Sequence, residues 1–107
     1  MVFELKQSDK NDEFYFTLKD ADGKALIFSE GYKQKASALN GIESVKNNTA
    51  AARFELKTSE SGSFFFNIIA TNGQVVGRSS MFETEAGRES ALEALKASVA
   101  DAITAEI

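Results

Sequence analysis

The stretch Phe3–Lys6, FELK, recurs as Phe54–Lys57, and the aromatic run Phe14–Phe16, FYF, recurs as Phe64–Phe66, FFF. Self-similarity of this kind identifies a repeated folding unit, and it has to be recognised before individual helices and strands are assigned. The two copies then keep a common register through Gly23 and Gly73, Ser29 and Ser79, Tyr32 and Phe82, Ala36 and Ala86, Ile42 and Leu92, Val45 and Leu95, and Lys46 and Lys96. We therefore expect one domain made of two repeats, residues 1–50 and 51–107.

Each repeat opens with two predicted strands. Val2–Gln7 and Arg53–Lys57 alternate apolar and charged residues, which is the period of a half-buried strand. Glu13–Lys19 and Ser63–Ala70 follow a polar turn and are rich in aromatic and β-branched residues. The side chains that this alternation turns toward the core are Phe14, Phe16 and Leu18 in the first repeat and Phe64, Phe66 and Ile68 in the second.

A third strand should follow each of these across a tight turn. Asp22-Gly23 and Asn72-Gly73 tolerate the positive φ angles of short hairpin connections, so they predict antiparallel neighbours. The expected third strands are Lys24–Ser29 and Gln74–Ser79. The inward phase of the first one stays open, because Ala25–Phe28 are all apolar.

The hydrophobic period then changes from two to about 3.6, which predicts a helix in each repeat. The apolar positions are Ala38, Ile42 and Val45 in the first and Leu92, Leu95, Val99 and Ile103 in the second. Thr84 can cap the second helix, whereas Gln34 is a poor cap, and Gly41 costs the first helix up to about 1 kcal/mol relative to Ala. We expect the first helix to be weaker and shorter, ending near Asn47-Asn48, and residues 104–107 to form helix or a short final strand.

The fold class predicted is α+β: two tandem β-β-β-α(-β) repeats that form one antiparallel sheet, with both helices packed on one face and a pseudo-twofold axis. A single repeat has one apolar sheet face and one thin helix stripe, which is close to the lower size limit for independent stability. No Pro or Gly-rich linker separates the repeats. The two copies should therefore share one core.

Composition narrows the possible partners. A net charge of −4, with the 12 Lys and Arg residues scattered along the chain, disfavours binding to nucleic-acid phosphates. The chain has no Cys, which excludes disulfides and thiolate metal sites and fits a reducing cytoplasm. No apolar run is long enough to span a bilayer, and Met1–Lys10 has no uninterrupted apolar segment like that of a secretory signal. We expect a cytoplasmic protein that does not enter the membrane.

An ordered series of segments resembles the YegP-like family across nearly the whole chain. The segments are Phe3–Lys6, Phe14–Lys19, Asp22-Gly23, Ser29–Tyr32 and Asn40–Lys46 in the first repeat, and Phe64–Asn67, Asn72–Gly77 and Met81-Phe82 in the second. The resemblance implies β-β-β-α-β units in one sheet, with the C-terminal strands exchanged between units. It also implies that members with a single unit pair as dimers, so we expect this chain to be a monomer that corresponds to a fused dimer. The family is a domain of unknown function, so it implies no catalytic residues. In one departure, the second repeat has Ala91-Leu92 where the first has Gly41-Ile42. The helix glycine therefore does not have a binding role common to both repeats.

No constellation of residues points to catalysis. The chain has no His and no Cys, so the commonest general base and the usual transition-metal ligands are missing. The acidic residues are spread out, and Asp20–Gly23 lacks the glycine and glutamate spacing of a calcium loop. We therefore expect no cofactor, no metal and no enzymatic activity.

Two candidate sites remain. The leading one is a surface for a protein partner or for self-association on the sheet face opposite the helices, formed by Tyr15, Thr17, Phe65, Asn67 and Ile69. A minor variant has Tyr15 and Phe65 stacking on single-stranded nucleic acid. The alternative is a small-ligand or anion site, or an enzyme site, at the strand-to-helix junctions. Its residues would be Ser29, Lys33, Lys35, Arg78, Ser79 and Arg88.

Overall fold

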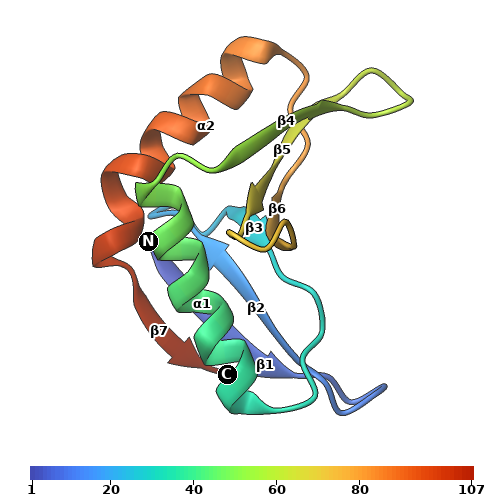
Figure 1. Ribbon diagram of the computed structural model, residues 1–107, viewed down its shortest axis with the longest axis vertical. Helices are drawn as coiled ribbons and strands as arrows, with labels where there is room; N and C mark the ends of the chain where they lie inside the picture. The colour runs from blue at the N-terminus through green and yellow to red at the C-terminus, as the bar shows by residue number, and fades with distance from the viewer.

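The repeat is visible in the order of the elements along the chain (Figure 1). The structure, a computed structural model, describes residues 1–107. The strands are β1 (Val2–Gln7), β2 (Phe14–Lys19), β3 (Ala25–Phe28), β4 (Phe54–Thr58), β5 (Phe64–Ile69), β6 (Val75–Ser79) and β7 (Ile103–Glu106). The helices are α1 (Lys35–Ala50), which follows β3, and α2 (Glu85–Ser98), which follows β6 and continues into a 3₁₀ turn, Val99–Asp101. Each repeat thus contributes three strands and a helix in the same order.

All seven strands form one sheet in the order β4-β5-β6-β3-β2-β1-β7. Every neighbouring pair is antiparallel except β1 and β7, which are parallel. The two repeats meet where β3 pairs with β6, in a ladder that opposes Ile27 to Ser79 and Phe28 to Arg78. Both helices lie on the same face of this sheet (Figure 1). The predicted fold class is confirmed.

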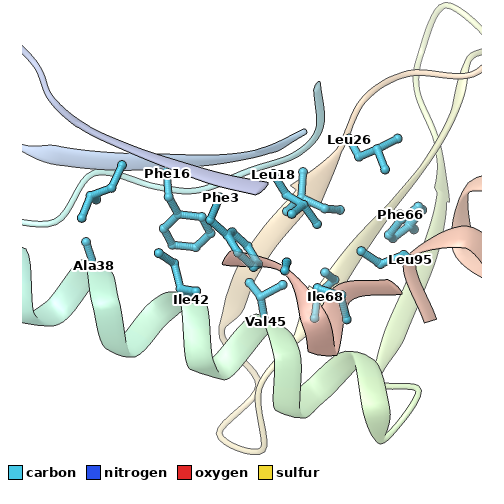
Figure 2. Close-up of a cluster of buried hydrophobic side chains, with 14 of the residues drawn as sticks. Phe3, Phe16, Leu18, Leu26, Ala38, Ile42, Val45, Phe66, Ile68 and Leu95 are labelled. Atoms are coloured by element: carbon cyan, nitrogen blue, oxygen red, sulfur yellow. The ribbon is translucent and has the colours of Figure 1, made fainter. Parts of the chain in front are cut away.

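The core lies between the sheet and the helices (Figure 2). Ala38, Ile42 and Val45 point from α1 toward the strands, and α1 packs against β2 in its own repeat and against β5 and β6 in the other. The strand residues predicted to face the core do so, and Phe16, Leu18, Phe66 and Ile68 are buried there. Because α1 covers strands of both repeats, the interior is shared.

The junction of the repeats depends on a close approach of β3 and β6. Ile27 is fully buried, and its counterpart in the second repeat is Gly77. A Cβ atom added to Gly77 would lie 2.7 Å from Cγ2 of Ile27, far inside van der Waals contact. One large and one absent side chain therefore fill a space beside the pseudo-twofold axis that cannot hold two isoleucines.

The third strands are shorter than the sequence suggested but keep the predicted hairpins. Gly23 and Gly73 adopt φ angles of 81° and 84°, as the tight turns require. A register shift in the β2–β3 ladder between Leu18 and Lys19 allows both Leu26 and Ile27 to be buried. Because of this register shift, the residues of β3 do not alternate strictly between the two faces of the sheet. The sequence pattern therefore could not show which side chains of β3 point inward.

The expectation that the first helix would be the shorter one is wrong. α1 has 16 residues and α2 has 14. The side-chain amide of Asn48 does bond to the helix backbone, since its Nδ2 donates to the carbonyl of Ser44 at 2.8 Å and to the Ser44 hydroxyl at 3.0 Å, but both bonds lie within the helix and do not end it. The helix therefore continues to Ala50, and the chain leaves it through Ala52 at a φ of 56°. The capping prediction is confirmed, since the Gly87 N–H donates to the Thr84 hydroxyl and Gln34 makes no side-chain cap.

The C-terminal residues form a strand, and strand exchange occurs in one direction. β7 leaves the second repeat and pairs with β1 of the first, and the Ile107 N–H donates to the carbonyl of Leu5 at 2.9 Å. The first repeat has no matching separate strand, because the residues between α1 and β4 are only Ala51–Arg53. Three residues are too few to form another strand, so the outer edge of β4 has no partner.

Two residues in close contact, Gly41 on α1 and Tyr32 before that helix, are both different in the second repeat. The Tyr32 ring stacks on Phe16, with ring centroids 6.2 Å apart. A Cβ atom at Gly41 would lie 2.5 Å from Oη of Tyr32. The second repeat has Phe82 and Ala91 at the corresponding positions, so the helix carries a methyl group where the aromatic ring lacks a hydroxyl.

This coupling predicts a non-additive pair of substitutions. Gly41→Ala should lower the free energy of unfolding by roughly 1–3 kcal/mol, because the methyl group meets the Tyr32 hydroxyl. In the Tyr32→Phe background the same change should cost less, because the closest contact is gone, although Cζ of the ring and Cε2 of Phe16 would still lie 2.9 Å and 3.0 Å from the added methyl group. Urea unfolding of the four proteins measures the coupling. Equal effects of Gly41→Ala in both backgrounds would contradict this explanation.

Tyr32 also predicts a dependence of stability on alkaline pH. Burial raises the pKa of the Tyr32 hydroxyl, and the Glu30 carboxylate adds to the rise. The folded protein therefore holds the phenolic proton more tightly than the unfolded chain, so this contribution is complete below about pH 10 and is lost as the pH rises through the folded-state pKa. Chemical unfolding from pH 8 upward should show a steeper loss for the wild type than for Tyr32→Phe. If the wild type and Tyr32→Phe lost stability in parallel as the pH rose, the raised pKa of Tyr32 would be contradicted.

Candidate functional site

The sheet face opposite the helices carries a continuous row of six side chains. The register pairs Glu55 with Asn67, Asn67 with Arg78, Arg78 with Phe28, Phe28 with Thr17, and Thr17 with Glu4. We call these six residues the central row. Phe28 and Arg78 are counterparts in the two repeats and lie directly opposite each other, so the pseudo-twofold axis passes between them.

The five residues predicted as a partner surface all lie on this face. Tyr15, Thr17, Phe65 and Ile69 are half-buried there, whereas Asn67 is only 6% exposed. The Nδ2 atom of Asn67 donates to Oε1 of Glu55 at 3.1 Å, and its Oδ1 atom has no donor. The four half-buried side chains therefore form the accessible part of the predicted surface, whereas the Oδ1 atom of Asn67 is buried beneath it.

Tyr15 is held in place by its surroundings. Its hydroxyl accepts a hydrogen bond from Nδ2 of Asn11 at 3.0 Å and donates to Glu13 at 3.5 Å. The ring lies so close to Gly31 that a Cβ there would be 2.8 Å from the hydroxyl. The counterparts in the second repeat are Phe65 and Met81, so the glycine again accompanies the tyrosine.

The centre of the face combines a cation with an exposed aromatic ring. Arg78 lies over the ring of Phe65, with 5.8 Å from Cζ to the ring centroid. Arg78 forms no ion pair, whereas Glu4 pairs with Lys19 and Glu55 pairs with Lys57. Phe28 is 44% exposed. Beside it is a shallow hollow of about 280 Å³, lined by Phe28, Ser29, Glu30, Val75, Gly77 and Arg78.

The two junction serines have the same structural role in both repeats. The Ser29 hydroxyl accepts a hydrogen bond from the Phe16 N–H at 2.9 Å and donates to the Glu30 carbonyl at 2.8 Å. The Ser79 hydroxyl accepts from the Phe66 N–H at 2.9 Å and donates to the Ser80 carbonyl at 2.8 Å. Each serine thus satisfies a backbone N–H of the second strand where the third strand turns away.

The six residues of the predicted anion site do not lie together. Lys35 pairs with Glu106 on β7, and Lys33 is exposed. Nη1 of Arg88 donates to the Lys57 carbonyl at 3.1 Å, and its guanidinium lies over Phe64. Because Phe64 and Phe65 are successive residues of β5, Arg88 and Arg78 lie on opposite faces of the sheet.

Sequence reasoning missed Phe28 as part of the helix-free face. Its strand, Ala25–Phe28, is apolar throughout, so no alternation was available to orient it. The signal was in the repeat: the counterpart of Phe28 is Arg78, and an arginine at that position indicates a residue that faces solvent.

The remaining chemistry of the molecule is sparse. No group of three or more Asp and Glu residues is arranged to hold a metal ion. Tyr32, the residue whose pKa burial raises, packs on Phe16 between the sheet and α1 and is not part of the helix-free face. Neither helix has the length and apolarity needed to cross a bilayer.

Fold and surface together define a small tandem-repeat α+β protein with one face of its sheet free of helices. The model of the family described as "Domain of unknown function (DUF1508)" matches this chain twice, over residues 9–55 and 59–106. The chain belongs to that family, and the resemblance found in its sequence is confirmed. The family has no assigned activity.

Several relatives cover nearly all of the chain. The UPF0339 protein in the ptx operon 5' region of Stutzerimonas stutzeri is 46% identical over 99% of this chain and 96% of its own length. UPF0339 protein YegP of Escherichia coli (strain K12) is 42% identical over 89% of this chain and 86% of its own length. The solution NMR structure of E. coli yegP, described as a protein of unknown function, superposes with a TM-score of 0.90 at 37% identity and covers 98% of this chain and 90% of that one.

The structural role of the junction serines gives a prediction. Ser79→Ala should lower the free energy of unfolding by about 1–3 kcal/mol, because the buried N–H of Phe66 loses its acceptor. Ser29→Ala should cost less, about 1 kcal/mol, since water can reach the half-buried site. Urea unfolding measures both, and added phosphate should not change the difference. Wild-type stability of both variants, or stabilisation by phosphate that either variant abolishes, would contradict the structural role.

Proposed function

We propose that this protein is a non-catalytic binding module that holds a protein partner on its helix-free sheet face. The observation that carries the proposal is the placement of Arg78 beside Phe28 at the centre of that face. The guanidinium has no acidic partner within the protein, and 44% of Phe28 is exposed. A partner segment with a carboxylate next to an apolar side chain would satisfy both residues at once.

Two physical arguments support this centre as the contact point. Arginine and aromatic residues are enriched in the parts of interfaces that contribute most of the binding energy. Arg78 lies over the ring of Phe65, and this contact helps to hold the guanidinium in position.

The setting proposed for this binding is the cytoplasm. A chain without cysteine gains nothing from an oxidising compartment and is fully compatible with a reducing one. The acidic balance of the chain disfavours nucleic acid as the occupant of this face. A protein segment is therefore the partner class that fits both the charge and the apolar area.

A peptide selection tests the proposal. Random peptides displayed on phage should be selected on the immobilised full-length protein. We expect enrichment of sequences that place Asp or Glu next to a large apolar residue. Arg78→Glu and Phe28→Ser should each weaken binding of the selected peptides roughly tenfold or more, as expected at the centre of an interface.

Matched control variants separate the site from general surface effects. Lys24→Glu makes the same charge change in an exposed turn, and Leu39→Ser removes an apolar side chain of similar exposure on α1. Both should bind the selected peptides like the wild type. The proposal fails if the wild type enriches no common pattern, or if the control variants weaken binding as much as Arg78→Glu and Phe28→Ser.

A further inference from the structure

β4 is an edge strand with unpaired backbone groups. Its counterpart β1 is covered on its outer side by β7, whereas nothing pairs with the outer side of β4. On β1 the carbonyl of Leu5 accepts from β7, and the counterpart of Leu5 is Leu56. The Leu56 N–H and C=O groups therefore point away from the sheet, as do the Phe54 carbonyl and the Thr58 N–H.

At its centre β4 carries a leucine, Leu56, at the position where β1 carries Leu5 under an edge that another strand covers. Leu5 is 2% exposed beneath the edge that β7 covers, and Leu56 is 50% exposed beneath the open edge. Edge strands that avoid pairing carry proline, a bulge, a charge that points inward, or charged side chains such as Lys along the edge. β4 has the sequence FELKT, without proline, a bulge or an inward-pointing charge, and its two charges, Glu55 and Lys57, are of opposite sign.

The charged side chains of β4 are placed so that two antiparallel copies of this strand would bring opposite charges next to each other. Glu55 and Lys57 flank Leu56 and share the helix-free face. In an antiparallel pair centred on Leu56, Glu55 of one copy faces Lys57 of the second copy, and Lys57 faces Glu55 of the second copy. The same register brings the outward-pointing backbone groups of Leu56 opposite each other and those of Phe54 opposite Thr58.

The neighbouring registers are excluded by the same charges. A slip of one residue would oppose outward-pointing backbone groups to inward-pointing ones. A slip of two residues would oppose Glu55 to Glu55 or Lys57 to Lys57, and like charges directly opposite each other destabilise a sheet. Only the register centred on Leu56 satisfies both the hydrogen bonds and the charges.

We propose that two copies of this chain associate through β4, antiparallel and centred on Leu56, to form one continuous sheet. The other edge strand, β7, is a poorer choice, because its sequence ITAE carries one acid and no base. The contact involves one short strand from each copy, and interfaces below about 1,200 Å² are weak. The chain is therefore monomeric when dilute and dimerises at high micromolar concentration.

A charge-exchange experiment tests the pairing on the full chain by sedimentation velocity over a range of concentrations. Glu55→Lys and Lys57→Glu each place like charges across the contact, so each variant alone should dimerise about tenfold more weakly than the wild type. An equimolar mixture of the two should form a heterodimer, since every pair is then complementary. The double variant E55K/K57E should dimerise like the wild type.

Two measurements keep the result unambiguous. Amide chemical shifts of the wild type should change with concentration at Phe54–Thr58, and the spectra of the variants should show that the fold is kept. Phe28→Ser should leave dimerisation unchanged, which separates this contact from the proposed binding of a partner on the helix-free face. A wild type that stays monomeric, single variants that dimerise normally, a mixture that does not associate, or a dimer abolished by Phe28→Ser would each overturn the proposal.

Discussion

The close packing of Ile27 against Gly77 is the contact on which the rest of the structure depends. β3 and β6 join the halves of the sheet through only two opposed residue pairs, and the missing side chain at Gly77 lets them approach. α1 can then cover strands of both repeats, so that fifteen buried hydrophobic residues form one cluster. A larger residue at position 77 would separate the strands and divide that cluster, because well-packed interiors do not absorb added volume cheaply.

The same axis shows why the two repeats are no longer interchangeable. In a pair of identical units the residue on the axis would face itself, giving two phenylalanines or two arginines on the outer face, and the neighbouring core residue would be the same in both units. This chain instead has Phe28 opposite Arg78, with Ile27 packed against its counterpart Gly77 beside the axis. The unlike pairs allow a filled core on one side of the sheet and, on the other, a cation beside an aromatic ring. Fusion of the repeats therefore made the asymmetric surface possible.

Much of the fold followed from the sequence because the repeat supplied each observation twice. The strand alternation, the hairpin glycines and the helix period all recur, and where one copy was ambiguous the other was often clear. Ala25–Phe28 was not resolved, because its orientation depends on a register shift against β2 that no pattern encodes. The length of α1 was misjudged because Asn48 forms its hydrogen bonds within the helix, which propensity does not reveal. The crossing of the C-terminal strand to the other repeat was implied by the family resemblance, whereas its parallel pairing with β1 and its occurrence in one direction became visible only in the structure.

The candidate surface was predicted less completely than the fold. Tyr15, Thr17, Phe65 and Ile69 were placed on the correct face, because strand alternation determines the face of a residue. The pairing of Phe28 with Arg78 was not visible, since it joins strands of different repeats. Residues grouped only by their position near a strand-to-helix junction, such as Arg78 and Arg88, proved to lie on opposite faces. Proximity along the sequence is a weaker guide than the face of the strand.

The account rests on a single interior shared by both repeats, and native-state hydrogen exchange tests this most directly. Amide exchange should be followed in β2 and β5, the second strands of the two repeats, at increasing sub-denaturing concentrations of denaturant. A shared core predicts that the slowest amides of both strands open with the same free energy, equal to that of global unfolding. If the amides of one repeat exchanged through a separate opening of lower free energy while the other repeat stayed folded, the repeats would be independent units and the account would be contradicted.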